Sequence, residues 1–145
     1  MTTSQVGLPV VRAVHVRRQP EDAFRIFTAD IGAWWPMATH SVFGAAGQVA
    51  VEGLEIVERS GEGERTVWAE IEEWSPPRVL VLRWHPGTDP EKPTRVEVTF
   101  SPDSDGTRVE LVHTGWEALG ERAEAARQSY DKGWLSVLQR FAAAG

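Results

Sequence analysis

Histidine is the residue type in this sequence best suited to chemistry near neutral pH, because an imidazole can act as an acid, a base or a metal ligand. The chain has four histidines: His15, His40, His85 and His113. No two of them stand four residues apart, no HExxH motif occurs and cysteine is absent, so we expect neither a metal site nor a cofactor. The sequence also lacks a glycine-rich phosphate loop and a GxSxG elbow, and we predict no catalytic residues.

His113 has the most informative position of these residues. In the stretch TRVELVHTG, alternation places it on the same strand face as Val109 and Leu111. If that face is concave, the imidazole points inward, where it could orient a ligand, act as an acid or base, or form a structural hydrogen bond. His40, after WPMAT, could lie at the mouth of a cavity or in solvent, and His85, before Pro-Gly, is typical of a turn.

Seven tryptophans are an unusual number for a chain of 145 residues, and Trp34 and Trp35 are adjacent. Neighbouring side chains point well apart in a helix and to opposite faces in a strand, so one core wall cannot easily hold both rings. Asp30 can cap a short helix that carries the pair, and Pro36 ends it. At such a bend we expect one indole to turn into a cavity while the other packs against the last helix or the cavity mouth.

The elements that must position these side chains follow from periodicity. The segment PVVRAVHV predicts a first strand, and Pro20 begins a helix in which Phe24 and Phe27 share a face. After a second short helix, alternating segments predict the rest of an antiparallel sheet: QVAVEGLEIVER, RTVWAEIEEW, VLVLRW, TRVEVTF and TRVELVHT. The sheet then has about six strands, and alternation leaves the facing of Trp68 open.

One long helix is predicted from Trp116 to Phe141, because small or apolar residues recur there at spacings of three and four. Tyr130 and Trp134 lie on its apolar face. Gly133 beside them either lets another group approach the backbone closely or is a tolerated flaw. Helices segregated from an antiparallel sheet indicate an α+β fold, in which the long helix covers the concave side of a curved sheet.

A helix that stands off from a curved sheet leaves an apolar cavity, and ligand sites are mostly apolar hollows with few polar groups. We therefore predict that a hydrophobic small molecule binds in such a cavity. The candidate ligand-binding residues are inward-facing side chains: Phe24, Phe27, Trp34, Trp35, Trp84, Val98, Phe100, Leu111, His113, Tyr130 and Trp134. The alternative for each of them is a place in a plain packed core.

Composition describes an ordinary globular chain, with 41% hydrophobic and 25% charged residues. The net charge of −6 argues against binding to nucleic acid and to an anionic membrane surface. No apolar run reaches the roughly 20 residues of a membrane helix and no signal peptide is evident, so we expect no membrane insertion and a cytoplasmic location. We expect one domain over residues 1–145, with residues 1–9 as a flexible tail.

Four segments resemble the activator-of-Hsp90-ATPase-like (AHSA1) branch of the SRPBCC, or START/Bet v1-like, superfamily: PEDAFRIFTADIGAWWP, EEWSPPRVLVLRWHPG, TRVEVTFSPDSDGTRVELVHTGW and SYDKGWLSVLQRF. The resemblance runs from Val10 to Phe141. It implies a helix-grip fold, in which an antiparallel sheet wraps around a long C-terminal helix and encloses an apolar cavity. The chain departs from the pattern between Phe43 and Trp68, where it lacks an aromatic stretch common in relatives.

Three functions are compatible with these features. Superfamily members bind lipids, sterols, polyketides and other hydrophobic molecules, and we expect a ligand of this kind. The resemblance also implies an enzyme or self-sacrificing resistance protein that acts on a reactive hydrophobic natural product, with His113 or Tyr130 in its mechanism. A third alternative is a stress-response interaction domain of the Hsp90 co-chaperone kind, and a weak homodimer or chaperone contact is the protein partner we expect.

Overall fold

The computed structural model describes residues 8–144, in which seven antiparallel strands form a sheet in the order β1-β7-β6-β5-β4-β3-β2. The strands are β1 (Val10–Val16), β2 (Gln48–Glu52), β3 (Glu55–Arg59), β4 (Arg65–Ser75), β5 (Val79–Trp84), β6 (Thr94–Asp103) and β7 (Gly106–Thr114). The helices are α1 (Pro20–Thr28), α2 (Ile31–Trp34), the 3₁₀ segments η1 (Gly44–Ala46) and η2 (Trp116–Arg122), and α3 (Ala123–Ala144).

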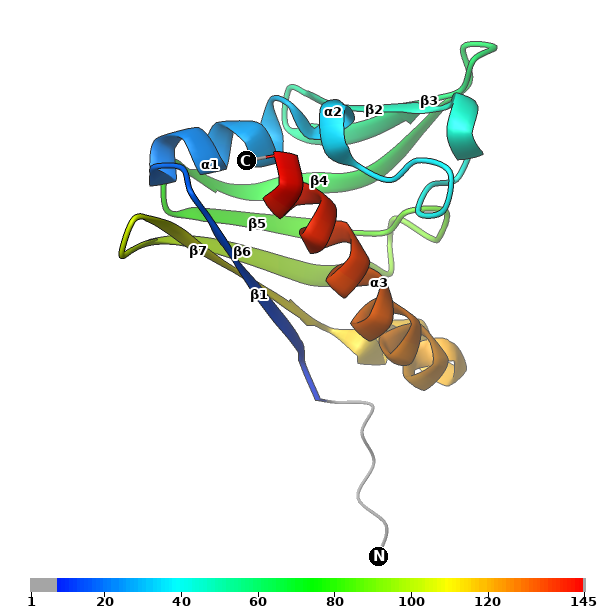
Figure 1. Ribbon diagram of the computed structural model, residues 1–145. Helices are drawn as coiled ribbons and strands as arrows, with labels where there is room; N and C mark the ends of the chain where they lie inside the picture. Colours follow the sequence, from blue (N-terminus) through cyan, green and yellow to red (C-terminus); the bar gives the residue numbers. More distant parts are fainter. Residues whose placement is uncertain (1–7, 145) are drawn as a thin grey trace, which may run out of the picture.

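The sheet curls around α3, which crosses its hollow side, while α1 and α2 lie at the end of the sheet where α3 finishes (Figure 1). This arrangement confirms the predicted α+β, helix-grip fold. Pro20 occupies the start of α1, with Glu21 and Asp22 in the first turn, where negative charge favours a helix. After α2, Trp35 takes an extended conformation, as expected for the residue before a proline.

The strand count differs from the prediction because one predicted strand is a hairpin. The segment QVAVEGLEIVER forms β2 and β3, which pair with each other from Gln48 opposite Arg59 to Glu52 opposite Glu55. The chain reverses at Gly53, whose φ of +61° lies in the left-handed region that glycine tolerates. Alternating residues on both sides of a two-residue turn look like one longer strand when the turn is missed.

The last helix also differs from the prediction at its start. The predicted helix began at Trp116, but residues Trp116–Arg122 form the 3₁₀ segment η2 and α3 begins at Ala123. Gly120 interrupts the helical geometry with φ 58° and ψ −125°. That backbone conformation is accessible mainly to glycine, which explains why the chain changes direction at Gly120.

Residues 1–7 of the predicted flexible tail lie outside the described residues. Leu8 is described, and its carbonyl accepts a 2.9 Å hydrogen bond from Nε of Arg127 on α3. Within residues 8–144, no helix is long and apolar enough to cross a membrane.

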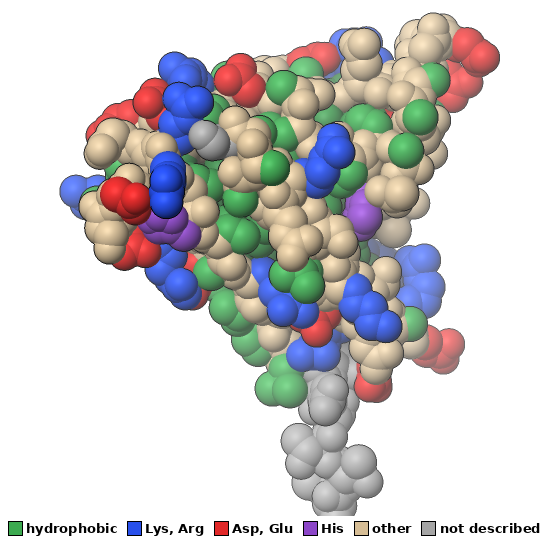
Figure 2. Space-filling view, viewed as in Figure 1, with side chains coloured by type: hydrophobic (Ala, Val, Ile, Leu, Met, Phe, Trp, Pro, Cys, Tyr) green, Lys and Arg blue, Asp and Glu red, His purple; other side chains and the backbone are tan. Residues whose placement is uncertain are grey.

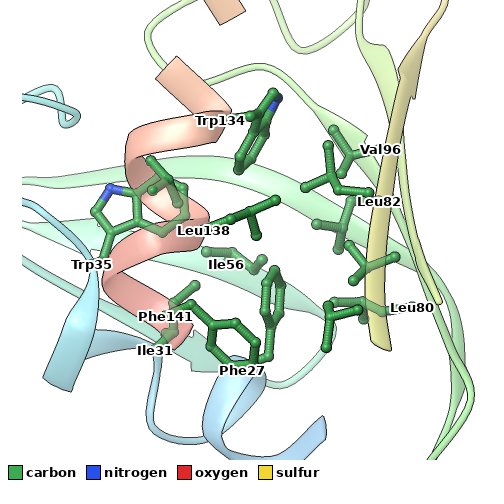
Figure 3. Close-up of a cluster of buried hydrophobic side chains, with 14 of the residues drawn as sticks. Phe27, Ile31, Trp35, Ile56, Leu80, Leu82, Val96, Trp134, Leu138 and Phe141 are labelled. Atoms are coloured by element: carbon green, nitrogen blue, oxygen red, sulfur yellow. The ribbon is translucent and has the colours of Figure 1, made fainter. Parts of the chain in front are cut away.

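The core lies between α3, α1 and the concave face of the sheet. The alternation predicted for β6 and β7 is confirmed, because Val98, Phe100 and Leu111 are at most 2% exposed. Figure 3 shows side chains of the helices and the sheet pointing toward one another; those it labels are Phe27, Ile31, Trp35, Ile56, Leu80, Leu82, Val96, Trp134, Leu138 and Phe141. The part of the interior between α1, the end of α3 and the sheet is filled by side chains.

Candidate ligand-binding site

A cavity of about 310 Å³ lies between the sheet, α3 and the loop that follows α2. Its apolar wall is built by four indoles: Trp35, Trp68, Trp84 and Trp134. Neighbouring indoles in this wall have ring centroids 5.0 to 6.2 Å apart. The other lining residues are Thr39, His40, Ser41, Val42, Pro86, Ser129, Tyr130, Gly133 and Val137. An aromatic wall beside a few hydroxyl and imidazole groups has the composition of a small-molecule site. We call this space the first cavity.

The two adjacent tryptophans separate as predicted. Trp35 lines the first cavity, and its Nε1–H donates a 2.6 Å hydrogen bond to the carbonyl of His40. Trp34 turns into the core, where its ring packs against Phe141 of α3 with a centroid distance of 5.1 Å. Its Nε1–H donates to the carbonyl of Ile26 over 2.8 Å. The bend after α1 therefore supplies one indole to the cavity and one to the packing of α3.

Trp68 reaches the first cavity because β4 contains a bulge. Ile56 pairs with Ala69 and Val57 with Val67, so no residue of β3 lies opposite Trp68. A bulge inserts an extra residue and shifts the alternation of side chains. Trp68 and Ala69 are consequently both buried, with 1% and 0% exposed.

A buried carboxylate holds the loop at the mouth of the first cavity. Glu58 on β3 is 0% exposed and accepts hydrogen bonds from the backbone N–H groups of Val42 and Phe43, each over 2.9 Å. The same carboxylate accepts a 2.9 Å bond from Nε1 of Trp68. Three donors offset the desolvation of the charged group and tie the loop to β3 and β4.

The ring of His40 lies against the backbone of α3 at Gly133. A Cβ added to Gly133 would lie 3.4 Å from Nε2 of His40, so the absent side chain leaves room for the imidazole. Nδ1 of His40 shares a 2.7 Å hydrogen bond with Oγ1 of Thr39. The glycine in the middle of the helix thus permits a close approach, and His40 lies at the cavity rather than free in solvent.

His113 is inward-facing, as predicted, but does not line the first cavity. The Nε1–H of Trp134 donates a 2.9 Å hydrogen bond to Nδ1 of His113, so this nitrogen is the acceptor and Nε2 carries the proton. Nε2 then donates over 2.7 Å to Oγ1 of Thr94, which donates over 3.2 Å to the carbonyl of Trp84. Burial lowers the pKa of His113 from 6.5 to about 3, because the charged imidazolium is poorly solvated there.

Tyr130 of α3 is hydrogen-bonded to Trp84 of β5 in the wall of the first cavity. Its hydroxyl accepts a 3.1 Å bond from Nε1 of Trp84. Burial raises the pKa of Tyr130, since the phenolate would lose solvation, while the bond from Trp84 acts in the opposite direction. The phenol is therefore a neutral hydrogen-bond donor at physiological pH.

The structure brings four of the predicted site residues together in the first cavity: Trp35, Trp84, Tyr130 and Trp134. The others lie in the packed interior instead: Phe24, Phe27, Trp34, Val98, Phe100, Leu111 and His113. At the α1 end, rings contact one another directly, for example Phe24 and Phe100 at 5.1 Å between centroids. The prediction missed several lining residues, among them Thr39, Ser41, Ser129 and Val137, because short polar loops and small helical residues carry no periodic signal.

The other two histidines pair with acids outside the first cavity. His85 follows β5, is 2% exposed, and places Nε2 2.9 Å from both carboxylate oxygens of Glu70. Nε2 of His15 lies 3.2 Å from Oδ1 of Asp105.

No group of three or more His, Cys, Asp or Glu side chains within residues 8–144 is placed to hold a metal ion. Basic and acidic side chains both occur on the face shown in Figure 2.

Comparison with known proteins agrees with this architecture. Residues 17–144 match the family model for activator of Hsp90 ATPase homolog 1-like proteins. No curated protein matches the chain in sequence.

Three solved structures illustrate the likeness. The anthrahydroquino-γ-pyrone synthase Txn09 is 28% identical, with a TM-score of 0.60 over 92% of this chain and 94% of that one. SSP2350 from Staphylococcus saprophyticus is 15% identical, with a TM-score of 0.64 over 93% of this chain and 89% of that one. DynU16, from the dynemicin biosynthetic locus, is 16% identical, with a TM-score of 0.61 over 92% of this chain and 45% of that one. The last two likenesses concern the fold alone.

Proposed function

Because the chain belongs to the family of activator of Hsp90 ATPase homolog 1-like proteins, within the SRPBCC superfamily, we propose that it binds a small, flat aromatic molecule in the first cavity. The observation that carries this proposal is the wall of four indoles beside an open space of about 310 Å³. Aromatic rings favour stacked and edge-to-face contacts with other aromatic rings. A wall of indoles therefore suits a planar aromatic ligand better than a flexible chain.

The size of the first cavity narrows the class of ligand. Its volume of about 310 Å³ lies at the lower end of the range of about 300 to 1,000 Å³ typical of small-molecule sites. A compact aromatic molecule of two or three rings is favoured over a sterol or a two-chain lipid. Txn09 is by name a synthase of an anthrahydroquino-γ-pyrone, which supports an aromatic polyketide-like ligand for this chain.

Polar groups on one side of the first cavity give such a ligand an orientation. Thr39, His40 and Ser41 come from the loop after α2, and Tyr130 comes from α3. A ligand with a hydroxyl or carbonyl group would place its polar edge toward them and its rings against the indoles. The loop is held in place by Glu58, so the polar edge of the site is formed before the ligand arrives.

A second candidate function is catalysis on the bound molecule, and His40 is the observation that favours it. Its imidazole lines the first cavity and is hydrogen-bonded to Thr39 through Nδ1. An oriented imidazole beside an aromatic ligand can remove a proton from a phenol or an activated carbon. Replacement by His40→Gln separates the two functions, because a catalytic role predicts lost turnover with retained binding.

The proposal is tested with chromone, a bicyclic γ-pyrone, by calorimetry and by intrinsic tryptophan fluorescence. We expect saturable binding that changes the emission, and we expect Gly133→Leu to abolish it, because the new side chain would enter the first cavity beside His40. Gln139→Leu is the matched control, since this residue of α3 is exposed and does not line the first cavity. The proposal is wrong if wild-type protein shows no saturable binding, or if both leucine variants bind equally well.

A further inference from the structure

A second cavity, of about 340 Å³, lies next to the first along α3. Its walls include Trp84, Thr88, Thr94, Leu119, Ala126 and Tyr130. Trp84 and Tyr130 line both cavities, so these two side chains form the wall that the cavities share. Each cavity alone has the volume of a small-molecule site, and together they would form a channel along the helix.

The shared wall is held by one hydrogen bond, from Nε1 of Trp84 to the hydroxyl of Tyr130 over 3.1 Å. An indole N–H can only donate, whereas a phenol can accept and donate at once. Within residues 8–144, no acceptor is bonded to the proton of the Tyr130 hydroxyl. A donor without an acceptor therefore lies at the junction of two cavities, and the bond from Trp84 makes it a stronger donor.

Two of the neighbours of Tyr130 on α3 are small residues. Ala126 lies four residues before it and Gly133 three residues after it, so both are adjacent on the helix surface. Ala126 lines the second cavity and Gly133 the first. Small residues therefore border the phenol toward each cavity, while its ring stacks against Trp134 of the same helix with centroids 6.1 Å apart.

We propose, on the basis of the binding function above, that the two cavities form one extended site for an elongated aromatic ketone. Its ring system occupies the first cavity, and a further ring or chain enters the second cavity past Tyr130. The carbonyl oxygen of the ligand lies at the junction, where it accepts hydrogen bonds from the hydroxyl of Tyr130 and from Nε1 of Trp84. The ligand thus replaces the bond between the two side chains and leaves neither donor unpaired.

The test compares three related probes by calorimetry: chromone, flavone and flavan. Flavone is chromone with an added phenyl ring, and flavan has the same ring skeleton without the carbonyl and without the C2–C3 double bond. We expect flavone to bind wild-type protein at least about tenfold more tightly than chromone, because the added ring is buried in the second cavity. We also expect Tyr130→Phe to reduce the preference for flavone over flavan by about fivefold, since the donor to the carbonyl is lost.

The variant Ala126→Phe fills the second cavity from a partly exposed position that does not line the first. It should bind chromone as the wild type does and lose the preference for flavone. Leu119→Trp fills the same cavity from η2, and it replaces Ala126→Phe in the test if that variant does not fold. If wild-type protein binds chromone but binds flavone no more tightly, the extended site is refuted and the proposed function stands. The same conclusion follows if the variants with a filled second cavity still bind flavone more tightly than chromone. Absence of chromone binding to the wild type refutes both.

Discussion

The indole N–H of Trp134 donates a 2.9 Å hydrogen bond to Nδ1 of His113, and this bond determines the protonation state of the histidine. Because Trp134 donates to Nδ1, this nitrogen must carry a free lone pair, so the ring is neutral and has its proton on Nε2. The same contact links the cavity wall to the core, because Trp134 lines the first cavity while His113 is buried and does not line it. Protonation of His113 would break the bond and leave a charge in the core.

The folded protein should lose stability in mild acid because of His113. Its pKa is about 3 in the folded state and near 6.5 in the unfolded chain, so the unfolded state binds the proton first as the pH falls. This stability is complete above pH 6.5 and is lost progressively toward pH 3. From pH 7.5 to pH 5 we expect a decrease of about 2 kcal/mol in the free energy of unfolding, measured by urea denaturation.

The control for this pH effect is His113→Gln, whose amide can accept from Trp134 and donate to Thr94 without titrating. Carboxylates contribute to acid unfolding in both proteins, so only the difference between the two pH profiles reports on His113. We expect a clearly shallower profile in the variant between pH 7.5 and pH 5. Parallel profiles would show that His113 is not the group responsible.

Replacement of Glu58 by glutamine should destabilise the fold and loosen the loop at the cavity mouth. The carboxylate accepts three hydrogen bonds while 0% exposed, and an amide nitrogen would face one of the backbone N–H donors. We expect a loss of about 2 to 3 kcal/mol, with faster hydrogen exchange at the amides of Val42 and Phe43.

The matched control for Glu58 is Glu52→Gln on β2. Glu52 forms an ion pair with Arg59 over 2.9 Å, but both side chains are largely solvated, at 36% and 50% exposed. Exposed pairs contribute little to stability, so this variant should unfold like the wild type. A similar loss in both variants would indicate that the general loss of charge, and not the buried network, is responsible.

Gly133→Ala should stabilise the helix without closing the first cavity. Alanine is favoured over glycine within a helix by about 1 kcal/mol, and the added methyl group would only touch the ring of His40 at 3.4 Å. We expect the free energy of unfolding to rise by up to about 1 kcal/mol and chromone binding to persist. A marked loss of stability on thermal unfolding would show that His40 cannot adjust to the contact.

Much of the fold could be predicted from the sequence, because its regular segments have strong periodicity. The alternation in TRVEVTF and TRVELVHT correctly predicts the buried faces of β6 and β7, including His113. Proline at the start of α1 and after α2 marks both ends of the helical bend. The two errors, at Gly53 and Gly120, arise where a glycine with positive φ reverses or kinks the chain inside an apparently continuous pattern.

The candidate site was harder to predict, because it depends on contacts between distant segments. The facing of Trp68 follows from a bulge opposite β3, which no periodic pattern shows. Phe24 and Leu111 face inward as expected, yet they lie where the interior is filled rather than where it is open. Which inward residues border a hollow depends on the volumes of all side chains around them.

The most direct test of the binding site is a titration of isotope-labelled protein with chromone, followed through the indole N–H signals in a ¹H–¹⁵N spectrum. We expect saturable shifts for the four indoles of the first cavity, Trp35, Trp68, Trp84 and Trp134. The signals of Trp34, Trp74 and Trp116, which do not line it, should shift much less. Shifts confined to the exposed Trp74, or no saturable shift at any indole, would show that chromone does not bind in the first cavity.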